Sequence, residues 1–220
     1  MAEVRACLVD VYETLITYDP GARFAGLAAL CGVPPGALRR DQDSTRPQRH
    51  RGALSTAGSF RLTLARCGAD SGPRAVSGLV RADREIMRTV ARAYGDAAPF
   101  LRELRARGVA VAIVSNCGDN TRPLLEDLGL APLADSLVLS CETGSVKPSP
   151  EIYTAALGAL GVPADEAVMV DDRAEYLTGA EAVGVRGIHL TRDDPVPGPG
   201  FPAVRGLEDV IPLLARLPAK

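Results

Sequence analysis

The sequence of 220 residues contains no tryptophan, and aromatic residues make up only 4% of it. Platforms that stack the bases of single-stranded nucleic acid need aromatic side chains, so no such platform is expected. Charge is nearly balanced, with 25 Lys and Arg residues against 27 Asp and Glu residues and a formal net charge of -2. This balance argues against broad attachment to nucleic acid or to a membrane surface. No apolar run approaches about 18 residues, so a membrane span is not expected.

The five cysteines are an odd number, and no two have the C-x-x-C spacing of a zinc site. The first ten residues lack the length and the cleavage site of a secretory signal. We therefore expect buried thiols in a reducing cytoplasm and no disulfide framework. Hydrophobic residues make up 46% of the chain and charged residues 24%, which is typical of a globular protein. The length suits one large domain, or one domain with a smaller insert.

Short apolar segments alternate with helical patterns along most of the chain. The apolar segments lack strict alternation, which is typical of strands buried on both faces of a parallel sheet. They cover residues 4–9, 109–114, 136–139, 167–170 and 185–190. Helical patterns, each followed by a glycine that suits a helix C-terminus, cover residues 97–107, 121–128, 150–160 and 176–183. The alternation predicts an α/β fold with right-handed crossovers.

Polar residues directly follow three of the predicted strands, and they are the main functional signal of the sequence. Ligands of open parallel sheets bind beyond the carboxyl ends of the strands. The residues at these ends are Asp10, Ser115, Asn116, Asp171 and Asp172.

Each of these residue types has a chemical interpretation and an ordinary structural one. Asp10 is either an ionised nucleophile or a residue that caps a turn. The pair at 115 and 116 either donates hydrogen bonds to an anion or forms a turn. The adjacent carboxylates at 171 and 172 repel each other unless a cation or donor intervenes, so they either ligate Mg²⁺ or one of them caps a helix. Lys147, held before a proline, either neutralises a transferred anion or lies on the surface.

Residues 17–94 interrupt the alternation between the first and the second predicted strand. The segment has helix-like stretches at 24–31, 60–67 and 76–94 and no clear strand, and residues 41–58 suggest a mobile loop. It is interpreted either as a solvated helical bundle or as a cap that turns some arginines toward an anionic ligand. These arginines are Arg39, Arg40, Arg46, Arg49, Arg51, Arg61 and Arg66. Near the end of the chain, residues 193–202 predict a loop before a last helix at 207–217.

Four stretches, taken together and in order, resemble the motifs of the haloacid dehalogenase superfamily of hydrolases. They are LVDVYETL around Asp10, IVSN ending at Asn116, SVKPSPEIY around Lys147 and VMVDDRAEY around Asp171. The resemblance covers nearly the whole chain. It implies a Rossmann-like parallel-sheet core of residues 1–16 and 95–220 with an inserted all-helical cap of residues 17–94.

The resemblance also implies a role for each motif residue. Asp10 would be the nucleophile that forms a covalent aspartyl intermediate, and Lys147 would hold this nucleophile and the anion together. Binding of the transferred group would fall to Thr14, Ser115 and Asn116. The ligands of Mg²⁺ would be Asp10, Asp171, Asp172 and the main-chain carbonyl of Tyr12.

One position departs from the phosphatase pattern of this family. Phosphatases carry an Asp two residues after the nucleophile, where it protonates the leaving alcohol and later activates water; here that catalytic position holds Tyr12. A phenol with a pKa near ~10 is a poor base at neutral pH. The loss of a positioned acid or base costs about 10²- to 10⁴-fold in rate. A Tyr here resembles the 2-haloacid dehalogenase branch, in which halide leaves without a proton, whereas the acidic pair at 171 and 172 resembles the metal-dependent branch.

Three functions stay open on the sequence alone. The first is Mg²⁺-dependent hydrolysis of a small phosphate ester with altered acid and base provision, for which His50 of the insert is a candidate acid. The second is hydrolysis of a carbon–halogen or similar bond in a small 2-substituted acid, with Arg40 or Arg46 binding the carboxylate or the leaving anion. The third is a binding or regulatory protein with little or no turnover. In each case we expect a small anionic ligand, and either a monomer or a homodimer.

Overall fold

The computed structural model describes residues 3–192 and 200–215. Its main sheet has six strands in the order β5-β4-β1-β6-β7-β8, and every neighbouring pair is parallel. The strands are β1 (Ala6–Val9), β4 (Ala110–Ser115), β5 (Ser136–Leu139), β6 (Ala167–Asp171), β7 (Arg186–Leu190) and β8 (Ala203–Val204). The first five confirm the predicted strands, and the two-residue β8 was not predicted. The α/β fold with a parallel sheet is therefore confirmed.

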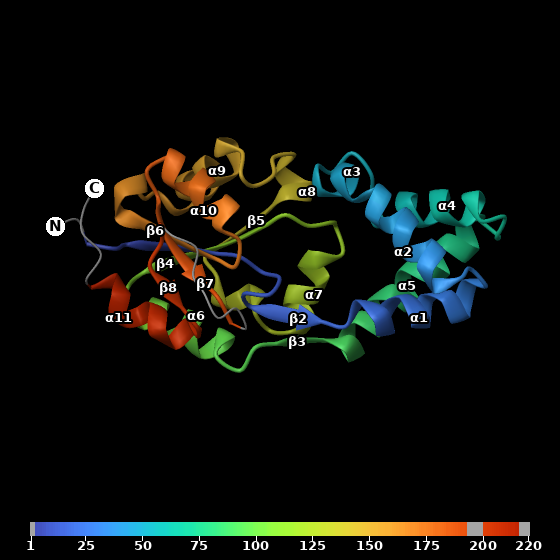
Figure 1. Cartoon of the computed structure of the whole chain (residues 1–220), viewed down its shortest axis with the longest axis horizontal. Coiled ribbons are helices and arrows are strands. Elements are labelled where there is room, and N and C mark those ends of the chain that lie inside the picture. The colour runs from blue at the N-terminus through green and yellow to red at the C-terminus, as the bar shows by residue number, and fades with distance from the viewer. Residues whose placement is uncertain (1–2, 193–199, 216–220) are drawn as a thin grey trace.

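Helices cover both faces of this sheet (Figure 1). The core helices are α6 (Ala97–Ala106), α7 (Thr121–Asp127), α8 (Ser140–Thr143), α9 (Pro150–Leu160), α10 (Ala174–Ala182) and α11 (Val210–Leu214). Short 3₁₀ turns lie at Ala131–Leu133, Ala164–Glu166 and Leu207–Asp209. Helices α9 and α10 pack on one face, while α6 and α11 lie on the other.

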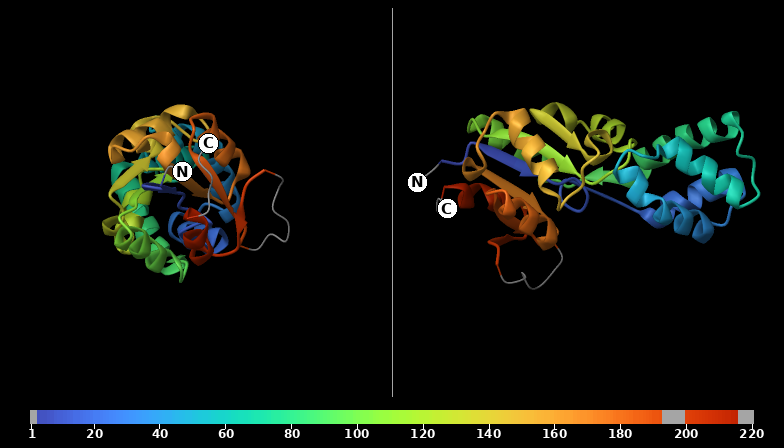
Figure 2. Two further views of the ribbon diagram at one scale, coloured as in Figure 1. Left: turned by 90° about the vertical axis from the view of Figure 1, so that its left-hand side faces the viewer. Right: turned by 90° about the horizontal axis from the view of Figure 1, so that it is seen from above.

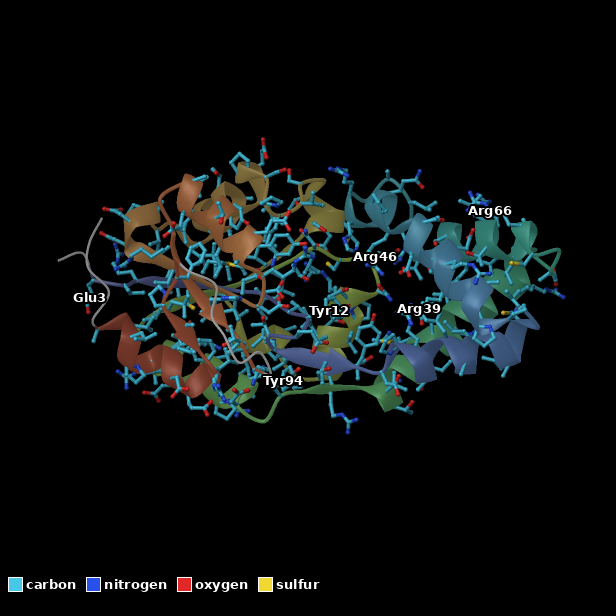
Figure 3. All side chains as sticks on the ribbon, viewed as in Figure 1. Glu3, Tyr12, Arg39, Arg46, Arg66 and Tyr94 are labelled. Carbon is cyan, nitrogen blue, oxygen red and sulfur yellow. The ribbon has the colours of Figure 1, made fainter. Side chains whose placement is uncertain are left out.

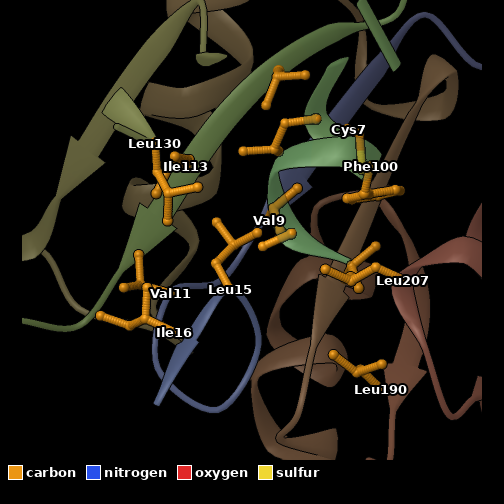
Figure 4. Close-up of a cluster of buried hydrophobic side chains, with 14 of the residues drawn as sticks. Cys7, Val9, Val11, Leu15, Ile16, Phe100, Ile113, Leu130, Leu190 and Leu207 are labelled. Carbon is orange, nitrogen blue, oxygen red and sulfur yellow. The ribbon is translucent and has the colours of Figure 1, made fainter. Parts of the chain in front are cut away.

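The alternation of side chains along the central strand divides the core in two. Ala6 and Leu8 of β1 point into the cluster beneath α9 and α10. Cys7 and Val9 point into the opposite cluster, which includes Phe100 of α6 and is drawn in Figure 4. Successive side chains of a strand face opposite sides, so a strand covered by helices on both sides is apolar throughout. Full burial of one such aliphatic side chain contributes about 1.5–3 kcal/mol.

The arginine-rich insert forms a group of helices at one end of the molecule (Figures 1 and 2). These helices are α1 (Pro20–Cys31), α2 (Pro35–Ser44), α3 (Arg46–His50), α4 (Thr56–Arg66) and α5 (Pro73–Val90). They have a hydrophobic cluster of their own, with Phe24, Leu38 and Phe60 among its members. The boundaries at residues 17 and 94 stay a prediction.

Two expectations for the insert were wrong. Residues 41–58 are mostly helical, because their polar side chains bond inward: Thr45 Oγ1 shares a hydrogen bond of 2.8 Å with Ser59 Oγ, and Gln42 Nε2 donates to Thr63 Oγ1 at 3.0 Å. The expected absence of strands was also wrong, since β2 (Ile16–Tyr18) pairs antiparallel with β3 (Ala91–Ala93). The segment that leaves the core and the segment that returns to it lie side by side there and pair as strands. This strand pairing replaces the last turn of the helix that was predicted to reach residue 94.

The end of the chain is less helical than predicted. A 3₁₀ turn and the short α11 replace the helix expected at 207–217, whose last two residues lie outside the described part. Most of the loop predicted at 193–202 also lies outside it. All five cysteines are free, but only Cys7 and Cys117 are buried, so the expectation of uniformly buried thiols was wrong. Among the described helices, none combines the length and apolarity that a membrane crossing requires.

Candidate active site

The central strand β1 brings its C-terminal end level with those of both neighbours. Its last residue, Val9, pairs with Ile113 of β4 and with Val170 of β6. The amide of Asp10 donates to the carbonyl of Val170 at 3.0 Å. Parallel strands end at the same edge of a sheet, so side chains just beyond these pairs gather there. The structure thus brings together polar residues that lie more than 100 positions apart in the sequence.

Lys147 lies between two of the predicted carboxylates. Its Nζ is 2.5 Å from Asp10 Oδ1 and 2.6 Å from Asp171 Oδ2, and its side chain has no exposed surface. The chain has only two lysines against 23 arginines. A compact ammonium with three rotatable donors fits between two converging carboxylates better than a planar guanidinium does. The surface interpretation of Lys147 is therefore wrong, and it belongs to the cluster at the sheet edge.

Burial controls the electrostatics of this cluster. It raises the pKa of Asp10 to about 6, although the attraction of Lys147 acts in the opposite direction. It also raises the pKa values of Asp171 and Asp172, the second of which lies close to the charge of Asp10. Burial alone would lower the pKa of Lys147, but the two carboxylates outweigh it and raise that pKa. The lysine is therefore a firmly held cation among more carboxylates than it can neutralise.

Three carboxylates of this cluster have the arrangement of a cation site. Oxygen atoms of Asp10, Asp171 and Asp172 all lie within 4.8 Å of one another. Hard divalent cations such as Mg²⁺ are bound by carboxylate oxygens of this kind. One ammonium for three carboxylates leaves negative charge uncompensated, so the residues present fit a divalent cation.

Asn116 supports the lysine from behind. Its Nδ2 donates to the carbonyl of Lys147 at 2.8 Å, and its Oδ1 accepts from the amide of Lys147 at 2.7 Å. Both polar atoms of the amide thus hold the backbone of another motif. These contacts make Asn116 a positioning residue and give no support to the substrate contact that was expected of it.

Two buried hydroxyls of the predicted site have no partner among the described residues. Thr14 Oγ1 and Ser115 Oγ are inaccessible to solvent and make no hydrogen bond. A buried polar group left without a bond costs about 1–3 kcal/mol. Thr14 follows a sharp turn at Glu13, a non-glycine residue with a φ of 58°. Unpartnered hydroxyls near the ends of β1 and β4 are suited to donate hydrogen bonds to the oxygen atoms of an anion.

Tyr12 lies at the junction between the sheet and the helical insert (Figure 3). Its hydroxyl shares a hydrogen bond of 2.9 Å with Thr121 Oγ1, and its ring meets that of Tyr18 edge-on with the centroids 5.9 Å apart. Burial raises the pKa of the Tyr12 phenol further above its usual range. The neighbouring Glu13 accepts hydrogen bonds from Tyr94 and Thr17. Neither side chain is therefore placed as an acid for a leaving group.

Comparison with known proteins decides the family. The model of the haloacid dehalogenase-like hydrolases matches residues 4–184. The chain belongs to this family. A glyceraldehyde 3-phosphate phosphatase from Methanopyrus kandleri is 30% identical over 97% of this chain and 99% of its own. An (S)-2-haloacid dehalogenase from Burkholderia cepacia is 33% identical, but over 56% of each chain.

Solved structures of this hydrolase family share the fold. A dehalogenase structure with 27% identity covers 99% of this chain and 98% of its own, with a TM-score of 0.68. A 2-haloacid dehalogenase from Pseudomonas syringae has a TM-score of 0.75 over 97% of this chain and 99% of its own, at 22% identity. The chain is thus a haloacid dehalogenase-like hydrolase with both phosphatase and dehalogenase relatives.

The insert residues expected at the site of this hydrolase are less favourably placed. Arg40 is exposed on α2 and has no bonding partner within residues 3–192 and 200–215. Arg46 is exposed and pairs with Asp43 on the surface. His50 is half-buried, and burial together with two neighbouring arginines lowers its pKa to about 4. A histidine with this pKa is neutral at pH 7 and holds no proton to donate as an imidazolium.

Three further residues near the cluster were not among the predicted site residues. The ring of Tyr176 lies 4.9 Å from Lys147 Nζ, and Tyr153 Oη donates to the carbonyl of Tyr176 at 2.6 Å. Gly179 leaves room for Pro148, since a Cβ there would come within 2.5 Å of the proline carbonyl oxygen. This close approach of α10 places Lys147 over the end of β6.

Proposed function

We propose that this hydrolase cleaves small phosphate esters with Asp10 as nucleophile and Mg²⁺ as cofactor. The observation that supports it best is the cluster of three carboxylates, two of which pair with one buried lysine, together with two unpartnered hydroxyls near the ends of β1 and β4. The phosphatase relative that matches nearly the whole chain points the same way.

In this proposal, Asp10 attacks the phosphorus of the ester. A bond forms between its carboxylate oxygen and phosphorus, the ester bond to the alcohol breaks, and the alkoxide takes a proton from water. Water then attacks the aspartyl phosphate, which releases inorganic phosphate and restores the carboxylate. Lys147 holds the nucleophile in place, and Thr14 and Ser115 donate to the oxygens of the transferred group.

The cofactor would be held by Asp10, Asp171 and Asp172, together with the main-chain carbonyl of Tyr12. When bound, Mg²⁺ supplies charge that offsets the negative phosphoryl group. Like-charged carboxylates at this spacing favour binding of a cation. The helical insert of residues 17–94 would act as a cap that excludes water from the site.

A second candidate is hydrolysis of a carbon–halogen bond in a small 2-substituted acid. The observation that favours it is Tyr12, whose hydroxyl bonds to Thr121 and whose pKa is raised, so no acid stands where an alkoxide would leave. A halide leaves without a proton, and this chemistry would proceed with the same nucleophile and no metal.

A substrate panel with and without EDTA separates the two candidates. The proposed phosphatase releases phosphate from p-nitrophenyl phosphate only with Mg²⁺, and Asp10→Asn abolishes the release. The dehalogenase alternative predicts halide release from 2-chloropropionate in EDTA. Phosphate release that survives either Asp10→Asn or EDTA would contradict the proposal.

A further inference from the structure

Arg49 is a cap arginine that the sequence did not distinguish from its neighbours. It lies on α3 and is only 9% exposed, whereas Arg40 and Arg46 lie on the surface. Its Nη2 donates to the carbonyl of Gln42 at 3.0 Å, and its buried Nε has no partner among the described residues. No carboxylate of the described chain lies within ion-pair distance of it.

The guanidinium of Arg49 faces the loop that follows β4. A Cβ on Gly118 would lie 3.4 Å from Arg49 Nη1 and 3.2 Å from Asn120 Oδ1. Gly118 lies in that loop, three residues beyond Ser115, the last residue of β4, whose hydroxyl is unpartnered. The absence of a side chain at Gly118 leaves the guanidinium close to the backbone of the loop that follows β4.

The acidic residues nearest to Arg49 are already engaged. Asp83 accepts two hydrogen bonds from Arg23, at 2.6 and 2.9 Å, and one from Asn120 at 3.3 Å. Asp119 accepts from the amide and the hydroxyl of Thr56. Burial and the positive charges of Arg23 and Arg46 lower the pKa of Arg49, because the nearby carboxylates do not fully compensate its charge. A buried charge without a partner is costly unless an anion completes it.

We propose that Arg49 binds a carboxylate at the end of the substrate opposite the reacting bond, so that the enzyme prefers small phosphorylated carboxylic acids. This inference rests on the proposed function and adds the substrate class. Three residues of extended chain span at most about 10–11 Å, which limits the separation between Ser115 and the backbone that Arg49 faces. A substrate bridging the two groups is therefore an acid of a few carbon atoms. A guanidinium matches a carboxylate through two parallel N–H donors.

The test compares Arg49→Gln and Arg49→Lys with Arg61→Gln and Arg66→Gln, two exposed arginines of the same insert, as matched controls. Phosphoglycolate carries a carboxylate and ethyl phosphate does not. We expect Arg49→Gln to lower kcat/KM for phosphoglycolate on the order of 100-fold, the size of a lost charge-assisted bond, mainly through KM. The value for ethyl phosphate should change by less than about 3-fold, and Arg49→Lys should recover only part of the loss. Both control variants should behave as wild type.

A binding experiment without turnover separates this inference from the proposed function. Calorimetric titration of the protein with phosphonoacetate and with methylphosphonate, in the presence of Mg²⁺, should show tighter binding of phosphonoacetate, and Arg49→Gln should remove this preference. That result supports binding of a carboxylate by Arg49 even if no ester is hydrolysed. In that case the proposed function fails and this inference stands. Equal weakening for both esters, or equal binding of both phosphonates by wild type, assigns Arg49 to cap packing and overturns the inference.

Discussion

Replacing Lys147 with methionine tests how the buried cluster is held together. Methionine has a similar length and no charge, so Asp10 and Asp171 lose the ammonium that lies 2.5 and 2.6 Å from them. Removing one partner of a buried ion pair costs about 3–5 kcal/mol, because a charge is left buried without compensation. A natural domain has a total stability of about 5–15 kcal/mol, so Lys147→Met removes a large share of it.

The loss should depend on pH, and its direction follows from the carboxylates. The pKa of Asp10 is already raised to about 6 with the lysine present, and without the ammonium it rises further. When the pKa of a carboxyl is higher in the folded than in the unfolded state, the folded state holds the proton more tightly. Protonation therefore stabilises the fold at low pH, and this stabilisation is lost as pH rises through the folded pKa. We expect the full loss of about 3–5 kcal/mol near pH 8 and a clearly smaller loss near pH 5.

Urea denaturation followed by circular dichroism measures both values. Arg122→Met is the matched control, because Arg122 pairs with Glu142 at 2.7 Å on the surface, where such a pair contributes about 0–1 kcal/mol. The reasoning is refuted if Lys147→Met costs less than about 1 kcal/mol near pH 8, or if the same loss is found at both pH values.

Three further substitutions test other parts of the structure. Gly179→Ala places a Cβ 2.5 Å from the carbonyl oxygen of Pro148 and should lower the free energy of unfolding by about 1–3 kcal/mol in thermal denaturation. The control Gly158→Ala adds a Cβ in open space on α9 and should be neutral or stabilising. Equal effects of the two variants would contradict the packing argument. Burial lowers the folded pKa of His50 from 6.5 to about 4, so the stability that is present above pH 6.5 is lost as the pH drops toward 4. In denaturation curves at pH 6.5 and pH 4, His50→Gln should make this loss of stability smaller by about 1–3 kcal/mol. Tyr12→Asp should accelerate release of phosphate from ethyl phosphate by up to about 10²- to 10⁴-fold. The acceleration should be smaller for p-nitrophenyl phosphate, because its leaving group needs less protonation. An unchanged ratio of the two rates argues against a missing acid.

The sequence by itself determined the order and type of the core elements. Apolar runs such as residues 111–114 are buried on both sides, and each predicted core helix is followed by a glycine, so local pattern and final environment agree. It also placed Asp10, Ser115 and Asp171 at strand ends, because the end of an apolar run marks the edge of a buried sheet.

Only the tertiary structure decided which of those residues meet and which groups lack partners. The polar stretch at 41–58 is helical because its side chains bond to other helices, and such contacts leave no local pattern. Lys147 also leaves no local pattern, because the two carboxylates that bond to it lie 137 and 24 positions away in the sequence. Among seven arginines of similar sequence context, Arg49 alone is buried, against the loop that follows β4, because burial depends on how α3 packs and not on the residues beside it.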